Sequence, residues 1–138
     1  MDEGDQTAAG WVNNNTPADS SILVYSSNEN PALSPVLEWF PTLSQRRNLS
    51  TFQGREWLGG DVGYAVYWEL REGYQECLTR DSACLVSWLD ESASDIDYIY
   101  FSLGPEHHNN SLAESLRHTS GFKMVYQADS VVIFERLQ

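Results

Sequence analysis

Apolar and polar residues alternate with two different periods along the chain. Short runs of β-branched and aromatic residues, bounded by polar residues, predict strands at 21–25 and 97–103. Apolar residues spaced three and four apart predict helices between them. These helices cover residues 33–40, 64–78, 83–89 and 112–119, and residues 48–52 supply another short strand. Strands and helices are therefore expected to alternate.

The end of the chain has a different pattern. Residues 122–126 and 131–137 flank a short polar connection, as in a β-hairpin. The predicted fold is α/β, a Rossmann-like three-layer sandwich whose sheet is mostly parallel and ends in an antiparallel hairpin. Residues 1–17 form a lead-in and linker, helical or extended, that ends in the turn-forming segment 13–17. Residues 18–138 form a single domain.

Charge and hydropathy narrow the range of partners. The chain has 20 acidic and 8 basic residues, a formal net charge of −12. Such a chain repels phosphate backbones, so nucleic acid is not expected as a partner. No window approaches the roughly 20 apolar residues that cross a bilayer, and residues 1–6 lack the pattern of an export signal.

Motifs for catalysis or cofactor binding are not recognisable. No glycine follows the strand at 21–25 until Gly54, which argues against a dinucleotide cofactor. No Gly-x-Ser-x-Gly sequence presents a nucleophilic serine. Glu106, His107 and His108 lie in a predicted exposed loop and supply too few converging ligands for a metal. We therefore predict no catalytic residue, metal or cofactor.

Two segments are candidate binding sites. Ser26, Ser27 and Asn28 follow the first strand, where an open α/β sheet places ligands. The second segment concentrates large rings, guanidinium groups and polar side chains that could stack on sugars or grip anions. Its members are Glu38, Trp39, Arg46, Arg47, Gln53, Glu56 and Trp57. In the alternative interpretation, the tryptophans pack this loop onto the core and the arginines pair with its glutamates.

Cys77 and Cys84 leave two interpretations open. Their spacing fits neither a zinc site nor a redox motif. In an oxidising compartment they would form a disulfide, and in a reducing one they would be buried thiols.

Several segments carry a family resemblance. The run from Trp11 to Val24 resembles the linker and first strand that follow the last membrane helix in multispanning glycosyltransferases dependent on lipid-phosphate sugars. These enzymes are similar to the dolichyl-phosphate-mannose protein mannosyltransferases. Further similar segments are 38–41 with Arg46 and Arg47, 53–57, 97–103 and 121–134.

The resemblance implies the C-terminal extracytoplasmic domain of a bacterial membrane protein. The family's catalytic acidic residue lies in a membrane-proximal loop that this chain does not match, so no catalytic residue is carried over. The implied role is accessory, with the membrane part of the same parent chain as partner and a glycan or lipid-linked sugar as a possible contact. That location would favour the Cys77–Cys84 disulfide. The alternatives are a free-standing α/β domain that binds or converts a small molecule, and a structural protein-interaction module.

Overall fold

The fold was analysed in a computed structural model that describes residues 3–26, 44, 47–48, 72–92, 96–102, 111–128 and 131–137. The helices are α1 (Glu3–Asn15), a helical segment 72–76 continued by the 3-10 turn η2 (Cys77–Thr79), α4 (Ser82–Ser92) and α5 (Ser111–Arg117). The strands are β1 (Ser21–Ser26), β2 (Arg47–Asn48), β3 (Tyr98–Ser102), β4 (Phe122–Gln127) and β5 (Val131–Arg136). The predicted helix at 33–40 and the loop with Glu106, His107 and His108 lie outside these residues.

The described strands form one sheet in the order β2-β1-β3-β5-β4. β1 pairs in parallel with β3 and with the two-residue β2. β5 pairs antiparallel with both β3 and β4. The four longer strands therefore make one parallel and two antiparallel pairings, and the prediction of a mostly parallel Rossmann-like sheet is wrong.

The position of β5 explains this correction. Because β5 is antiparallel to both neighbours, β3 and β4 run in the same direction, joined through α5, but they are not adjacent. β5 is inserted between them, which makes β3-α5-β4 a split βαβ unit. The hairpin at the end of the chain thus forms one edge of the sheet, with β5 against β3 and β4 outermost, and it reverses the strand direction there.

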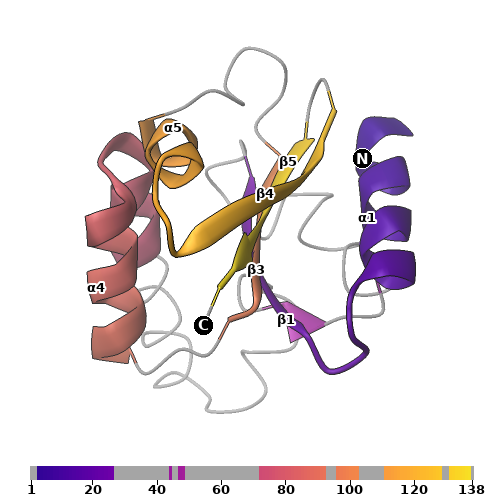
Figure 1. The fold of residues 1–138 in the computed structure, drawn as a ribbon, viewed down its shortest axis with the longest axis horizontal. Coiled ribbons are helices and arrows are strands. Elements are labelled where there is room, and N and C mark those ends of the chain that lie inside the picture. Colours follow the sequence, from indigo (N-terminus) through magenta and orange to yellow (C-terminus); the bar gives the residue numbers. More distant parts are fainter. Residues whose placement is uncertain are drawn as a thin grey trace.

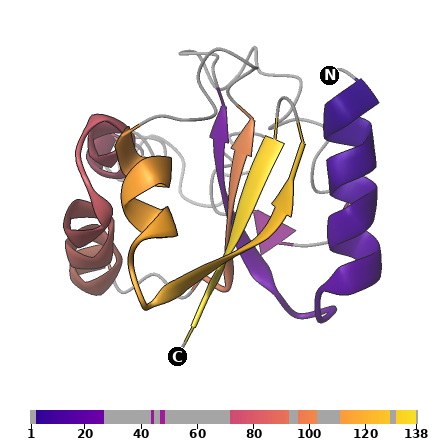
Figure 2. The same ribbon diagram turned by 45° about the horizontal axis from the view of Figure 1, so that its top comes forward.

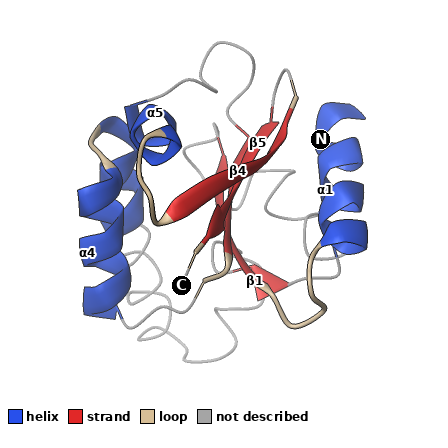
Figure 3. Cartoon of the chain, in the orientation of Figure 1, coloured by secondary structure: helices blue, strands red, loops and turns tan. Residues whose placement is uncertain are grey.

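Helices cover both faces of this sheet, with α1 on one side and α4 and α5 on the other (Figures 1 and 2). The secondary-structure colouring shows the twisted sheet between them (Figure 3). Side chains alternate along each central strand, as the pleat requires. In β1, Leu23 and Tyr25 face the α4 and α5 side, whereas Ile22 and Val24 face α1. Both faces are buried, which is why β1 and β3 are apolar almost throughout.

The amino-terminal segment contributes directly to the core. Residues predicted as a lead-in form α1, whose Ala8, Ala9 and Val12 are fully buried against the sheet. Asn15 and Thr16 end the helix through side-chain bonds to main-chain carbonyls one turn earlier. Among the described residues, no helix has the length and apolar character needed to cross a membrane.

Candidate functional site

The two sequence-predicted binding segments are represented by one residue each in the described structure. Ser26 ends β1 opposite Ser102 of β3, at the carboxyl ends of two parallel strands. Arg47 lies opposite Ser21 at the other end of β1. Five residue steps separate the ends of β1, which corresponds to roughly 16 Å. The main chains of Ser26 and Arg47 are therefore not brought together.

The remaining predicted binding residues lie outside the described part of the chain. They are Ser27, Asn28, Glu38, Trp39, Arg46, Gln53, Glu56 and Trp57. Their part in a binding site stays a prediction.

Cys77 and Cys84 are joined by a disulfide in the structure, with their Cα atoms 5.4 Å apart. Cys77 begins η2 and is buried, whereas Cys84 lies in the first turn of α4 and is partly exposed. Asp81 precedes α4 and accepts a 3.0 Å hydrogen bond from the amide of Cys84 through Oδ1. This is an N-cap, which starts α4 at the position that places Cys84 next to η2. The disulfide holds the two helical segments together, and the cap fixes where α4 begins.

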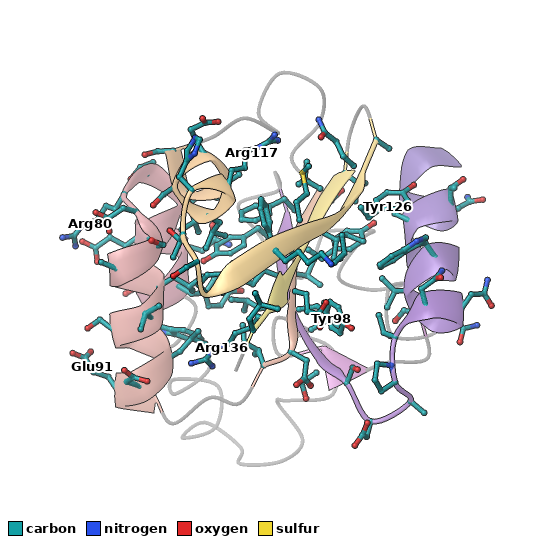
Figure 4. The ribbon with its side chains drawn as sticks, viewed as in Figure 1. Arg80, Glu91, Tyr98, Arg117, Tyr126 and Arg136 are labelled. Carbon is teal, nitrogen blue, oxygen red and sulfur yellow. A yellow bond between two sulfur atoms is a disulfide. The ribbon has the colours of Figure 1, made fainter. Side chains whose placement is uncertain are left out.

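A pocket of about 490 Å³ lies over this disulfide, between the 72–79 segment and α4. We call it the Trp88 pocket. Its lining includes Gly73, Glu76, Cys77, Cys84, Trp88 and Glu91. Arg80 also lines the pocket. Figure 4 shows Arg80 and Glu91 toward opposite ends of α4, with both side chains pointing away from the sheet. Its volume is within the usual range of small-ligand sites.

The indole of Trp88 is held in place from two sides. The ring of Tyr74 contacts it edge to face, with centroids 5.3 Å apart and planes at 73°. A Cβ added to Gly73 would lie 2.6 Å from both Cδ1 and Nε1 of the indole. Gly73 therefore allows a close approach that alanine would prevent without movement of the ring or helix. Trp88 remains partly exposed.

The rim of the Trp88 pocket is polar and acidic. Glu76 forms an exposed ion pair with Arg80 at 3.9 Å, and Ser87 donates a 3.5 Å hydrogen bond to Glu91. Both contacts lie at the surface, where such interactions contribute little to stability. With Asp81 included, three carboxylates and one guanidinium line the pocket. The rim thus offers hydrogen-bonding groups and carries net negative charge.

Tyr74 also connects the pocket to the core. The hydroxyl of the fully buried Tyr25 donates a 2.8 Å hydrogen bond to the main-chain carbonyl of Tyr74. Burial raises the pKa of the Tyr25 hydroxyl well above its ordinary value, and the neighbouring Tyr74 hydroxyl raises it further. The Tyr25 ring stacks on Phe101 with centroids 5.0 Å apart. The Tyr25 hydroxyl is therefore neutral near neutral pH, and its hydrogen bond and ring stacking serve the fold.

A second pocket, of about 390 Å³, lies at the amino-terminal ends of β1 and β3. Its lining includes Asp97, whose Oδ2 accepts a 2.9 Å hydrogen bond from the amide of Ser21. The main-chain amide of Asp97 donates to the carbonyl of Ser21. The main-chain carbonyl of Asp97 accepts a hydrogen bond from the main-chain amide of Arg136. Asp97 thus joins the ends of three strands, and its carboxylate serves the fold.

Among the residues that the structure describes, no group of three or more His, Cys, Asp or Glu side chains could hold a metal ion. His118 follows α5 and contacts Glu114 through Nε2 at 3.1 Å. This pair is exposed and spans one helical turn, as is common on helix surfaces.

The sequence interpretation did not include Trp88 among the site residues. Trp88 follows Cys84 by four positions, which places both on one face of α4. The spacing was a usable signal, but the contribution of Gly73 required the tertiary structure.

The wider comparisons found no match to this chain, either among protein families, among curated proteins or among solved structures.

Proposed function

We propose that this chain is a noncatalytic accessory domain on the extracytoplasmic face of a bacterial membrane, within a glycosyltransferase-like membrane protein. The domain would contact a glycan, and its partner would be the membrane-embedded part of the same parent chain. The family resemblance of the sequence motivates this proposal. The observation that carries it is the Cys77–Cys84 disulfide.

Disulfides persist in extracytoplasmic compartments and are rare where thiols are kept reduced. This one joins the start of η2 to the first turn of α4, across only seven positions of sequence. The described residues include no free cysteine. An oxidising location would therefore suit both cysteines of the chain.

The test is thiol alkylation of the protein recovered from cells that make the full-length parent chain. The recovered protein is denatured without reductant, alkylated, digested and measured by mass spectrometry. We expect the peptides that contain Cys77 and Cys84 to carry no alkyl group before reduction and one on each of these two cysteines afterwards. Alkylation of both cysteines without reductant would contradict an extracytoplasmic location.

Single Cys77→Ser and Cys84→Ser variants provide the control, because each leaves one thiol that must react. The proposal also predicts that the gene of the parent protein encodes membrane-spanning segments before residue 1. A gene without any such segment would contradict the proposed partner even if the disulfide is present.

A further inference from the structure

We infer that the Trp88 pocket binds an uncharged saccharide. This inference rests on the proposed function and identifies the surface through which the domain would contact the glycan. A saccharide presents an apolar face of C–H groups and an edge of hydroxyls. The pocket presents the two matching surfaces, a partly exposed indole and a polar rim. Trp side chains suit such contacts because the indole offers a large, rigid apolar area.

The indole is already positioned for a ligand. The Tyr74 ring packs against it at a steep angle, with ring centroids 5.3 Å apart, and Gly73 leaves room for its Cδ1 and Nε1 edge. The disulfide ties together the two segments that form the walls. A side chain that is fixed before binding loses little conformational entropy when the ligand arrives. This matters most for a shallow surface site, where few contacts are made.

Hydrogen-bonding groups from both walls line the same pocket as Trp88. Ser87 and Glu91 lie one turn apart on α4 and already share a 3.5 Å hydrogen bond. Arg80 and Glu76 form a similar pair on the other wall. Hydroxyl, carboxylate and guanidinium groups together supply both donors and acceptors for adjacent sugar hydroxyls.

Charge decides between an uncharged and a phosphorylated sugar. Glu76, Asp81 and Glu91 outnumber Arg80, which is already paired with Glu76. The chain as a whole, rim included, has a formal net charge of −12. A phosphate would be repelled by this rim. The pocket therefore suits the uncharged glycan and not the lipid-phosphate carrier.

The experiment follows the indole N–H signals of the ¹⁵N-labelled protein by NMR. The chain has five tryptophans, and Trp88→Phe identifies the signal of Trp88 by its disappearance. Mannotriose, maltotriose, cellotriose and chitotriose are titrated separately. We expect at least one of them to shift the Trp88 signal in a saturable way. No shift of that signal with any of the four would overturn the inference.

Two variants and a control test the role of the ring. Gly73→Ala should displace the indole, and Trp88→Leu should remove the stacking surface, so each should weaken binding by about tenfold. Trp11→Phe alters a tryptophan of α1, on the opposite side of the sheet, and should leave the affinity unchanged. Unfolding curves verify that each variant folds. Unchanged affinity in folded Trp88→Leu would overturn the inference.

A charge comparison completes the test. Mannose 1-phosphate should shift the Trp88 signal less than mannose at equal concentration, and a larger shift would overturn the assignment to an uncharged sugar. Failure of this inference is separable from failure of the proposed function. If Cys77 and Cys84 resist alkylation but no saccharide shifts the Trp88 signal, only the pocket assignment is overturned. If both thiols react without reductant, the extracytoplasmic location is overturned.

Discussion

The hydroxyl of Tyr25 donates a 2.8 Å hydrogen bond to the main-chain carbonyl of Tyr74, 49 positions further along the chain. The two rings also meet edge to face, with centroids 5.3 Å apart. Tyr74 then contacts Trp88, and Tyr25 stacks on Phe101. This row of rings joins the pocket at the surface to the centre of the sheet.

Tyr25→Phe should lower the free energy of unfolding by about 1–2 kcal/mol, because it leaves the Tyr74 carbonyl without this buried donor. Chemical denaturation monitored by circular dichroism measures the change. Tyr126→Phe is the matched control, since Tyr126 is only partly buried beside Trp11. Its effect should stay within about 0.5 kcal/mol. Equal effects of the two variants would contradict a structural role for the Tyr25 hydrogen bond.

Stability should fall at alkaline pH because the pKa of Tyr25 is raised in the folded state. The contribution of the neutral hydroxyl is fully present below the ordinary tyrosine pKa near 10, and it is lost as pH rises toward the folded-state pKa. We expect unfolding free energies measured above about pH 10 to fall less steeply in Tyr25→Phe than in the unmodified protein. The same pH dependence in both proteins would show that Tyr25 does not contribute.

Asp97→Ala should expose the start of β1 to exchange with solvent. The Asp97 carboxylate accepts a hydrogen bond from the amide of Ser21, which is itself buried. Loss of this hydrogen bond should lower the free energy of unfolding by about 1–3 kcal/mol and accelerate amide hydrogen exchange at Ser21. Asp97→Asn keeps an oxygen acceptor and should retain more protection. If Ser21 exchanges equally in all three proteins, the carboxylate does not hold this strand end.

Val12→Ala tests whether α1 belongs to the same folding unit as the sheet. Val12 is fully buried against Ile22 and Val24, so truncation should lower the unfolding free energy by roughly 1–2 kcal/mol. Asn14→Ala, at an exposed position of the same helix, should change it by less than about 0.5 kcal/mol. A negligible effect of Val12→Ala would mean that α1 is not anchored to the core.

Replacement of both Cys77 and Cys84 by alanine should lower the unfolding free energy by about 2 kcal/mol, because the short loop that they close gains freedom in the unfolded chain. Urea denaturation measures this difference. Addition of a reductant should destabilise the unmodified protein to a similar extent and leave the double variant unchanged. A reductant effect on the double variant would point to a cause other than the disulfide.

Local patterns in the sequence predicted several elements close to their final bounds. The apolar runs at 21–25 and 97–103 correspond to β1 and β3, and the helix at 112–119 corresponds to α5. The segments 122–126 and 131–137 form the β4–β5 hairpin. These features depend on residues near one another in the chain, so periodicity and turn residues are sufficient to reveal them.

The sequence by itself therefore determined the strands β1, β3, β4 and β5, the helices α4 and α5, and the net negative charge, but it left the form of residues 1–17 open. Only the tertiary structure decided that β5 lies between β3 and β4, that Asp97 joins three strand ends, and that Gly73 meets the indole of Trp88. The physical reason is that main-chain hydrogen-bonding groups are the same in every strand, so local pattern does not specify which strands pair. Partner choice depends on how two buried faces pack at once, and packing joins residues far apart in sequence.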